Sequence, residues 1–137
     1  MLEKAIILAA KAHEGQKDKG GECYILHSLR VMLCCEKKEQ KIVAVLHDVL
    51  EDTKVTKQCL IEVGFDKEIV DAVVCLTRNE KEQYFDYIKR VKQNDIARVV
   101  KLADLEDNMN LKRIKNVTEK DKKRVQKYKK AKQILEM

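Results

Sequence analysis

Residues that form tight turns are scarce in this chain, which has no proline and only four glycines among 137 residues. Aromatic residues make up only 4% of it. Strand-rich folds need frequent turns and favour aromatic side chains, so this composition argues against them. We therefore expect an all-α fold, a compact helical bundle of about seven to eight helices in a single domain over residues 1–137.

Hydrophobic periodicity and capping residues place these helices along the chain. The expected segments cover residues 2–14, 25–36 and 39–51, a short helix from about 56 to 63, and helices over 67–76, 82–93, 95–103 and 118–135. The segment 39–51 is apolar on nearly every side, which is typical of a central buried helix.

The net charge of +6 is concentrated at the C-terminal end of the chain. Residues 111–137 contain 11 Lys/Arg and 3 Asp/Glu, whereas the other 110 residues carry a net charge of −2. A solvated face is the simpler interpretation of the lysine-rich helix from about residue 118, and an anionic partner such as RNA is the alternative. Tyr128 is the only aromatic residue among these lysines, which argues against nucleic-acid recognition.

The five cysteines, at positions 23, 34, 35, 59 and 75, show no Cys-x-x-Cys spacing. An odd number of cysteines in mostly apolar settings is typical of reduced thiols, and we expect a cytoplasmic protein. No apolar run resembles a signal peptide or reaches the length of a membrane span, so no membrane partner is expected. The exposed residues of the first and last expected helices could support a homo-oligomer such as a dimer.

The pair His47-Asp48 lies inside the apolar run 42–50. A buried carboxylate is costly unless it is paired or bound to a metal, so packing alone does not account for this pair. Imidazole nitrogens and carboxylate oxygens are ligands of divalent transition metals. Together with Glu51-Asp52 at the end of the same run, the pair indicates a metal-dependent hydrolase.

Two further residues would complete a metal site. His27 lies in the preceding expected helix, and Asp104 follows the largely apolar stretch 99–103. Two imidazoles and two carboxylates suit Mn²⁺, Fe²⁺, Co²⁺ or Zn²⁺ better than Mg²⁺, which prefers oxygen ligands. Taken alone, His27 is more simply a hydrogen-bonded core residue, but the order His…His-Asp…Asp on three helices favours a metal site.

Candidate catalytic residues follow the central pair. Glu51 and Asp52 lie four residues after His47 and Asp48, so on a continuous helix each pair would share a face about one turn apart. The first member could then bind the metal while the second reaches a water beside it. Taken alone, Glu51 and Asp52 are more simply capping or solvated residues.

Two candidates for substrate binding flank Asp104 at helical spacing. Lys101 lies one turn before it, where an ammonium group could neutralise phosphate charge, and Asn108 lies one turn after it. Neither residue is distinctive by itself.

Together these segments resemble the HD superfamily of metal-dependent phosphohydrolases. More closely, they resemble the (p)ppGpp hydrolase domain of RelA/SpoT-type enzymes and their small stand-alone relatives. The matching segments are residues 12–16, 21–27, 46–53 and 100–109. The most specific part is His-Asp-x-x-Glu-Asp-Thr, from residue 47, combined with Lys-Leu-Ala-Asp, from residue 101.

The resemblance implies one metal, typically Mn²⁺, bound at the positions that match His27, His47, Asp48 and Asp104. It implies that Glu51 and Asp52 position or activate the attacking water. Asn108 matches a nucleotide contact, and the positions around Lys19 and Tyr24 approach the substrate. The implied reaction is removal of the 3′-pyrophosphate from ppGpp or pppGpp.

Two acidic residues depart from the alarmone hydrolase pattern. The family usually has Arg-Lys where this chain has Asp18-Lys19, and Asp107 lies in a segment that is more basic in the family. Acidic groups near the substrate would balance an anionic alarmone less well. We therefore expect hydrolysis of a phosphorylated nucleotide. The substrate could be ppGpp, another nucleotide or a small phosphoester. The alternative to an enzyme is a non-catalytic module that binds a metal and a nucleotide as a sensor.

Overall fold

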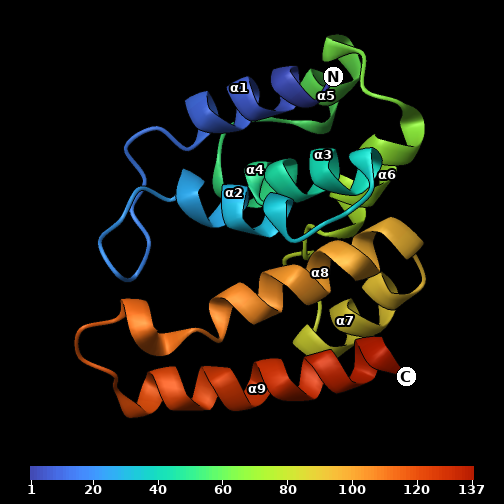
Figure 1. Ribbon diagram of the computed structural model, residues 1–137. Helices are drawn as coiled ribbons and strands as arrows, with labels where there is room; N and C mark the ends of the chain where they lie inside the picture. The colour runs from blue at the N-terminus through green and yellow to red at the C-terminus, as the bar shows by residue number, and fades with distance from the viewer.

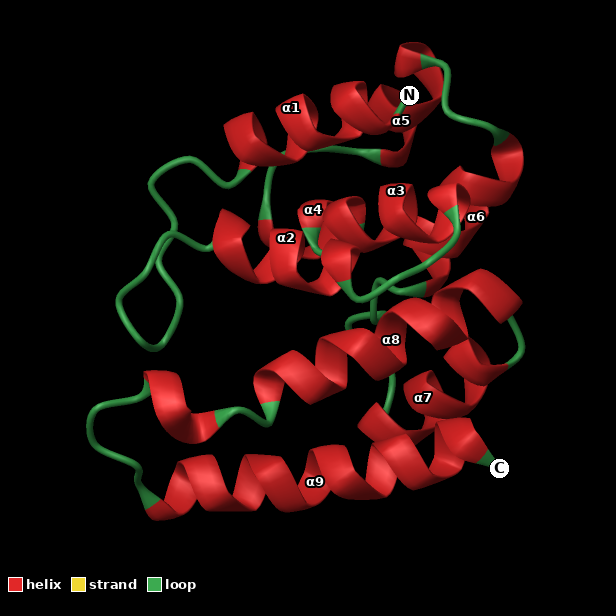
Figure 2. Cartoon of the chain, in the orientation of Figure 1, coloured by secondary structure: helices red, strands yellow, loops and turns green.

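The computed structural model describes all 137 residues and consists of helices joined by loops, with no strand (Figure 2). The helices are α1 (Leu2–Ala12), α2 (Ile25–Leu33), α3 (Lys38–Leu46), α4 (Val49–Asp52), α5 (Lys57–Val63), α6 (Lys67–Cys75), α7 (Tyr84–Lys92), α8 (Asp95–Asn108), the 3-10 helix η1 (Leu111–Arg113) and α9 (Glu119–Glu136). The predicted all-α class is confirmed. None of the helices is both long and apolar enough to cross a lipid bilayer.

Helix α3 lies at the centre of the fold, as its apolar sequence predicts. It contacts α1, α2, α6 and α8, and residues Ile42–Leu46 are all buried. Helix α8 lies between the α2–α3 pair and α9 (Figure 1). A single core of 26 buried apolar residues extends from α1 to α9. Each large apolar side chain buried there contributes about 1.5–3 kcal/mol, so this core fixes the helices that carry the site.

The expected helix over 39–51 is wrong in one respect, because it is interrupted at His47-Asp48. Helix α3 ends at Leu46 and α4 begins at Val49. The His47 backbone N–H donates to the carbonyl of Ala44, three residues back, and Nδ1 of the His47 ring lies 2.6 Å from the same carbonyl oxygen. The regular hydrogen-bond ladder is therefore broken at His47, and the split raises the number of α-helices to nine.

Capping residues fix the ends of several other helices. The Thr56 hydroxyl accepts a hydrogen bond from the backbone of Cys59 at the start of α5, and Gly64 ends that helix with φ of 100°. Asn94 caps α8 in the same way. Thr118 and Asp121 form the expected capping box of α9.

The loop between α1 and α2 lies against η1. A Cβ atom at Gly20 would approach the carbonyl oxygen of Arg113 to 2.6 Å, so only glycine allows this approach. The contact places the neighbouring residues Asp18 and Lys19 beside the end of α8.

Candidate metal centre and adjoining pockets

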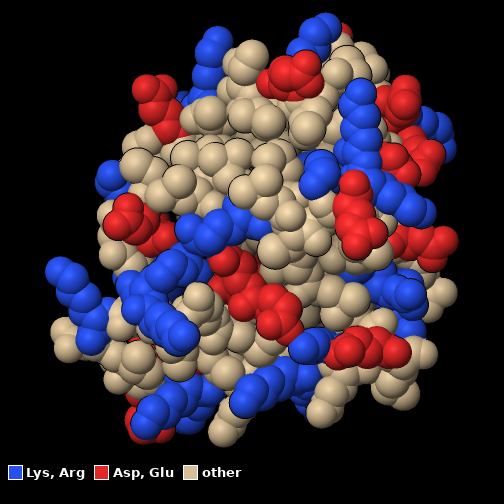
Figure 3. Space-filling view, in the orientation of Figure 1, with Lys and Arg blue, Asp and Glu red and all other residues tan.

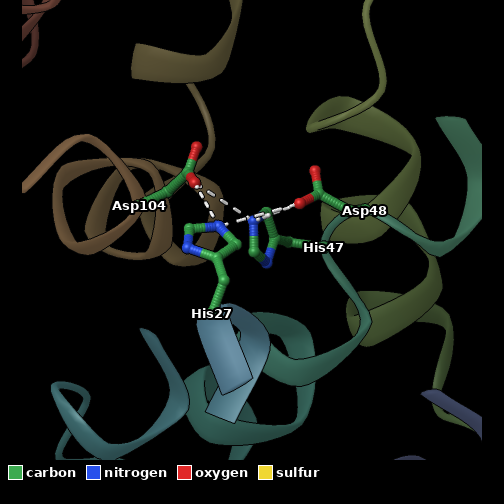
Figure 4. A group of neighbouring side chains, drawn as sticks. All are labelled: His27, His47, Asp48 and Asp104. Carbon is green, nitrogen blue, oxygen red and sulfur yellow. Dashed lines mark hydrogen bonds and ion pairs between the residues drawn. The ribbon is translucent and has the colours of Figure 1, made fainter. Parts of the chain in front are cut away.

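Two histidines and two aspartates from three parts of the chain converge at one point (Figure 4). His27 projects from α2, His47 and Asp48 from the break between α3 and α4, and Asp104 from α8. One ligand atom from each residue lies within 4.8 Å of the others. The structure thus brings together the four residues that the sequence singled out as metal ligands.

The donor atoms of this cluster are the Nε2 atoms of both histidines and one oxygen of each aspartate. Nε2 of His27 lies 2.9 Å and Nε2 of His47 3.2 Å from Oδ1 of Asp104. Nε2 of His47 also lies 3.0 Å from Oδ2 of Asp48. Both histidines and Asp104 are 2–3% exposed. The donors therefore face one another in a site that excludes most water.

Both histidines use their other ring nitrogen for a hydrogen bond. Nδ1 of His27 lies 2.6 Å from Oδ2 of Asp107, and Nδ1 of His47 faces the Ala44 carbonyl. Because carboxylate and carbonyl oxygens are acceptors, each Nδ1 carries the hydrogen and Nε2 holds the lone pair in a neutral ring. Metal-binding histidines are typically oriented in this way.

The charges of the cluster also fit a cation. Burial by itself would lower the pKa of His47, but Asp48 and Asp104 outweigh it and hold this pKa well above its usual value. Burial would raise the pKa of Asp104, but Lys101 and His47 hold it well below its usual range. The carboxylates thus stabilise positive charge on the imidazoles, and a divalent ion can replace those protons.

Asp107 is neutralised by arginines rather than presented to a substrate. Arg30 binds it through Nε at 2.8 Å and Nη2 at 3.1 Å, and Arg113 reaches it at 3.2 Å. Arg113 also lies 3.3 Å from a carboxylate oxygen of Asp18. The expectation that Asp18 and Asp107 add free negative charge near the substrate is therefore not met.

The catalytic candidates Glu51 and Asp52 lie beside the cluster of histidines and aspartates, in a pocket that Asp48 and Asp104 also line. We call this the metal pocket. Oε1 of Glu51 accepts a hydrogen bond from the backbone of Arg78 at 2.9 Å. Partial burial and the nearby Asp48 raise the pKa of Asp52 to about 6. Asp52 can therefore take up a proton near neutral pH.

The four substrate-binding candidates divide between this pocket and an adjoining one. Lys19 lies in the adjoining pocket, which we call the outer pocket, and Lys101 lies in the metal pocket. Tyr24 and Asn108 line both. The Tyr24 hydroxyl donates to Asp48, and the Asn108 amide donates to Asp104 at 3.0 Å.

The ammonium group of Lys101 lies 2.9 Å from Oδ2 of Asp104. Its charge is therefore largely used within the site rather than offered to a phosphate.

Residues of α9 that the sequence analysis did not select also line the pockets. Tyr128 lines both pockets, Arg124 the outer pocket and Lys127 the metal pocket. Lys and Arg side chains gather over α9 along the lower edge of the molecule (Figure 3). The solvated-face interpretation of this helix is therefore incomplete. The spacing of residues 124, 127 and 128, which places them on one helix face, is the signal that could have identified them.

Arg78, Tyr84 and Tyr87 line the metal pocket as well, and the sequence analysis did not select them either. They come from α7 and from the connection that precedes it. No local motif marks them.

This arrangement defines a helical domain that gathers two histidines and two aspartates beside a charged pocket. Residues 5–136 match the family model of the HD domain, and the chain belongs to the HD domain family. The family resemblance drawn from the sequence is confirmed.

Curated relatives match over most of this chain. The bifunctional (p)ppGpp synthase/hydrolase SpoT of Escherichia coli K12 is 33% identical over 123 residues, which cover 79% of this chain and 17% of the relative. The GTP pyrophosphokinase of Myxococcus xanthus is 35% identical over 127 residues, which cover 80% of this chain and 17% of the relative. The chain thus spans about a sixth of the length of these relatives.

A solved structure shows the same fold. It is that of a metazoan ortholog of SpoT that hydrolyses ppGpp and plays a role in starvation responses. It aligns with a TM-score of 0.79 at 20% sequence identity, over 98% of this chain and 84% of the other.

Proposed function

We propose that residues 1–137 form a single HD phosphohydrolase domain that uses one divalent metal ion to hydrolyse a phosphorylated nucleotide. The metal ion proposed is Mn²⁺. The metal ligands in this proposal are His27, His47, Asp48 and Asp104. The observation that carries it is the convergence of their four donor atoms within 4.8 Å, with each imidazole oriented through its Nδ1 atom. Fe²⁺, Co²⁺ and Zn²⁺ also suit this donor set.

The proposed substrate is guanosine-3′,5′-bis(diphosphate), from which the 3′-pyrophosphate is removed. Relatives with this activity in their names, such as the 3′-pyrophosphohydrolases of Vibrio cholerae and Aquifex aeolicus, are 32% and 31% identical to this chain. The neutralisation of Asp18 and Asp107 by arginines removes an electrostatic objection to so anionic a substrate.

The residues of the metal pocket have distinct roles in this reaction. A bound divalent ion lowers the pKa of a water and polarises a phosphoryl oxygen. Glu51 or Asp52 would accept a proton from the attacking water. The same carboxyl group would return a proton to the 3′ oxygen as its bond to phosphorus breaks, so that the nucleoside leaves with a 3′ hydroxyl. Burial and the nearby Asp48 raise the pKa of the Tyr24 hydroxyl, which therefore stays protonated. Its hydrogen bond orients the carboxylate of Asp48. Asn108 and Lys19 would steady the substrate, whereas Lys101 would neutralise Asp104.

The test begins with elemental analysis of the purified protein and continues with a nucleotide panel assayed with the metal found. Release of pyrophosphate from ppGpp supports the proposal. Release of phosphate only from another nucleotide or a phosphoester replaces the substrate but keeps the reaction class. Tight nucleotide binding without turnover of any substrate would make the domain a sensor.

A cytoplasmic location is part of the proposal. All five cysteines are free in the structure, which suits a reducing compartment.

A further inference from the structure

We propose that Arg78 and Lys127 form a subsite that holds the phosphate beyond the one attacked, so that the metal pocket selects a diphosphate over a single phosphate. This inference rests on the proposed function, because it assigns two specificity-determining residues to the same pocket. Both residues line that pocket together with the catalytic candidates Glu51 and Asp52. Arg78 comes from the α6–α7 connection and Lys127 from α9.

Both cations are free of carboxylate partners. Nζ of Lys127 lies 4.4 Å from the ring centroid of Tyr84 and 5.6 Å from that of Tyr128, and it makes no ion pair. The Arg78 guanidinium lies 5.7 Å from the Tyr84 centroid and donates to the Glu82 backbone carbonyl at 2.9 Å, again without an ion pair. By contrast, Lys101 in the same pocket is already paired with a carboxylate.

The Tyr84 ring holds these two like charges near each other. Partial burial and the nearby Arg78 lower the pKa of Lys127, with Arg124 and Lys101 adding to the effect. Lys127 is half-buried and Arg78 is exposed at the mouth of the pocket. Two such cations without a counterion repel each other, and an anion would relieve that repulsion. The arrangement is therefore typical of an anion-binding site rather than of a structural ion pair.

The charge balance of the metal pocket depends on the metal. Four carboxylates, those of Asp48, Glu51, Asp52 and Asp104, face three cations, those of Arg78, Lys101 and Lys127. With a divalent ion bound to neutral imidazoles, these seven side chains and the ion would together carry one net positive charge. Phosphate groups are therefore attracted to the metal-loaded pocket, where the two free cations are available.

The subsite is fixed next to the reacting position. The backbone N–H of Arg78 binds the carboxylate of Glu51 at 2.9 Å, so the guanidinium extends from a residue anchored to a catalytic candidate. One phosphate near the metal ligands and a second at Arg78 and Lys127 would lie in a single pocket. A diphosphate joins these two positions, whereas orthophosphate occupies only one of them.

The experiment is calorimetric titration of the Mn²⁺-loaded protein with pyrophosphate and, separately, with orthophosphate, with equal free Mn²⁺ in the cell and the syringe. Wild-type protein should bind pyrophosphate more tightly than orthophosphate. Lys127→Ala and Arg78→Ala should each weaken pyrophosphate binding about tenfold or more, as expected for a lost charge-assisted hydrogen bond. Orthophosphate affinity and bound Mn²⁺ should stay unchanged.

Lys130→Ala is the matched control. Lys130 lies on the same helix and its Nζ packs 4.6 Å from the Phe85 ring centroid, but it does not line the metal pocket. This variant should bind pyrophosphate like the wild type. Wild-type pyrophosphate affinity in both pocket variants, or an equal loss in Lys130→Ala, would overturn the subsite.

The outcomes separate the subsite from the proposed function. If the two pocket variants lose pyrophosphate affinity while no nucleotide is hydrolysed, the subsite stands and the hydrolase proposal fails. If ppGpp is hydrolysed but both variants bind pyrophosphate like the wild type, the hydrolase proposal stands and the subsite fails.

Discussion

Nδ1 of His27 lies 2.6 Å from Oδ2 of Asp107, a contact between α2 and the last turn of α8. The ring therefore points its Nε2 atom at Asp104 and Asp48. Burial alone would raise the pKa of Asp107, but its hydrogen bonds to His27 and Arg30 keep that pKa well below its usual range. The orientation of one proposed metal ligand thus depends on a carboxylate that stays charged.

Asp107→Asn should weaken metal binding by about 10- to 100-fold, the usual effect of mutating the hydrogen-bond partner of a metal-binding histidine, because a neutral amide replaces the charged carboxylate. Direct titration of the metal-free protein with Mn²⁺ measures the effect without reference to activity. The control is Glu106→Gln, because the neighbouring Glu106 carboxylate pairs only with Lys132 on α9. Equal metal affinities in the two variants would show that Asp107 does not orient His27.

Asp48→Ala should abolish both metal binding and turnover while the helical fold is retained. Its side chain is 17% exposed, against 5% for Asp104, so its loss leaves a smaller buried defect. Elemental analysis and circular dichroism check the two expectations. A full complement of metal in this variant would contradict the proposed ligand set.

Glu51→Gln should leave the metal bound but lower kcat by a factor of about 10² or more if Glu51 accepts the proton of the attacking water. The substitution keeps the size of the side chain, and the amide oxygen can still accept the hydrogen bond from Arg78. Metal content and kcat, measured on one preparation, separate the two effects. Unchanged kcat in this variant, with a large loss in Asp52→Asn, would assign the base to Asp52.

The pH dependence of activity should report on Asp52 if it is the base. A base must be deprotonated to act, so activity falls as the pH drops through the pKa of this group. Without metal the pKa of Asp52 is raised to about 6. A divalent ion near Asp48 favours the charged form of Asp52 and would bring this pKa back down. The acidic limb of kcat/KM should therefore lie at or below pH 6. An acidic limb that is unaltered in Asp52→Asn would exclude this assignment.

Glu82 should contribute to stability above acidic pH. Hydrogen bonds from Arg90 lower the pKa of Glu82 to about 2, below its unfolded value of about 4.3. The stabilising contribution is therefore present above about pH 4.3 and is lost as the pH falls toward 2. Glu82→Gln should lower Tm at pH 7 and reduce its dependence on pH between 4.3 and 2. Thermal melts across this range, with exposed Glu80→Gln as the control, test it.

Much of the fold could be predicted from the sequence because helix periodicity and capping are local signals. The capping box of Thr118 and Asp121 and the glycine at position 64 mark helix ends in the sequence as they do in the structure. The break at His47 could not be predicted in this way, because it depends on how the His47 ring and backbone share the Ala44 carbonyl.

The candidate site could be predicted only in part. The four proposed metal ligands can be recognised because burying a polar or charged side chain in an apolar segment is costly unless it is paired or binds a metal. They are His27, His47, Asp48 and Asp104. Lys127 and Arg78 do not stand out, since lysines and arginines are common on helices and loops. Lys127 reaches the pocket only because α9 packs against α7 and α8. Arg78 is placed there by the contact of its backbone N–H with Glu51, which is 27 residues earlier in the chain.

Arg113 joins the two ends of the site, since its guanidinium contacts both Asp18 in the α1–α2 loop and Asp107 behind His27. The part of the loop that lines the outer pocket and the part of α8 that orients His27 are therefore not independent. Replacing Asp18 by a basic residue, to suit a different base or a more anionic ligand, would repel this arginine and disturb the support of His27. Changes in nucleotide preference would thus have to be accompanied by compensating changes at Arg113 or Asp107.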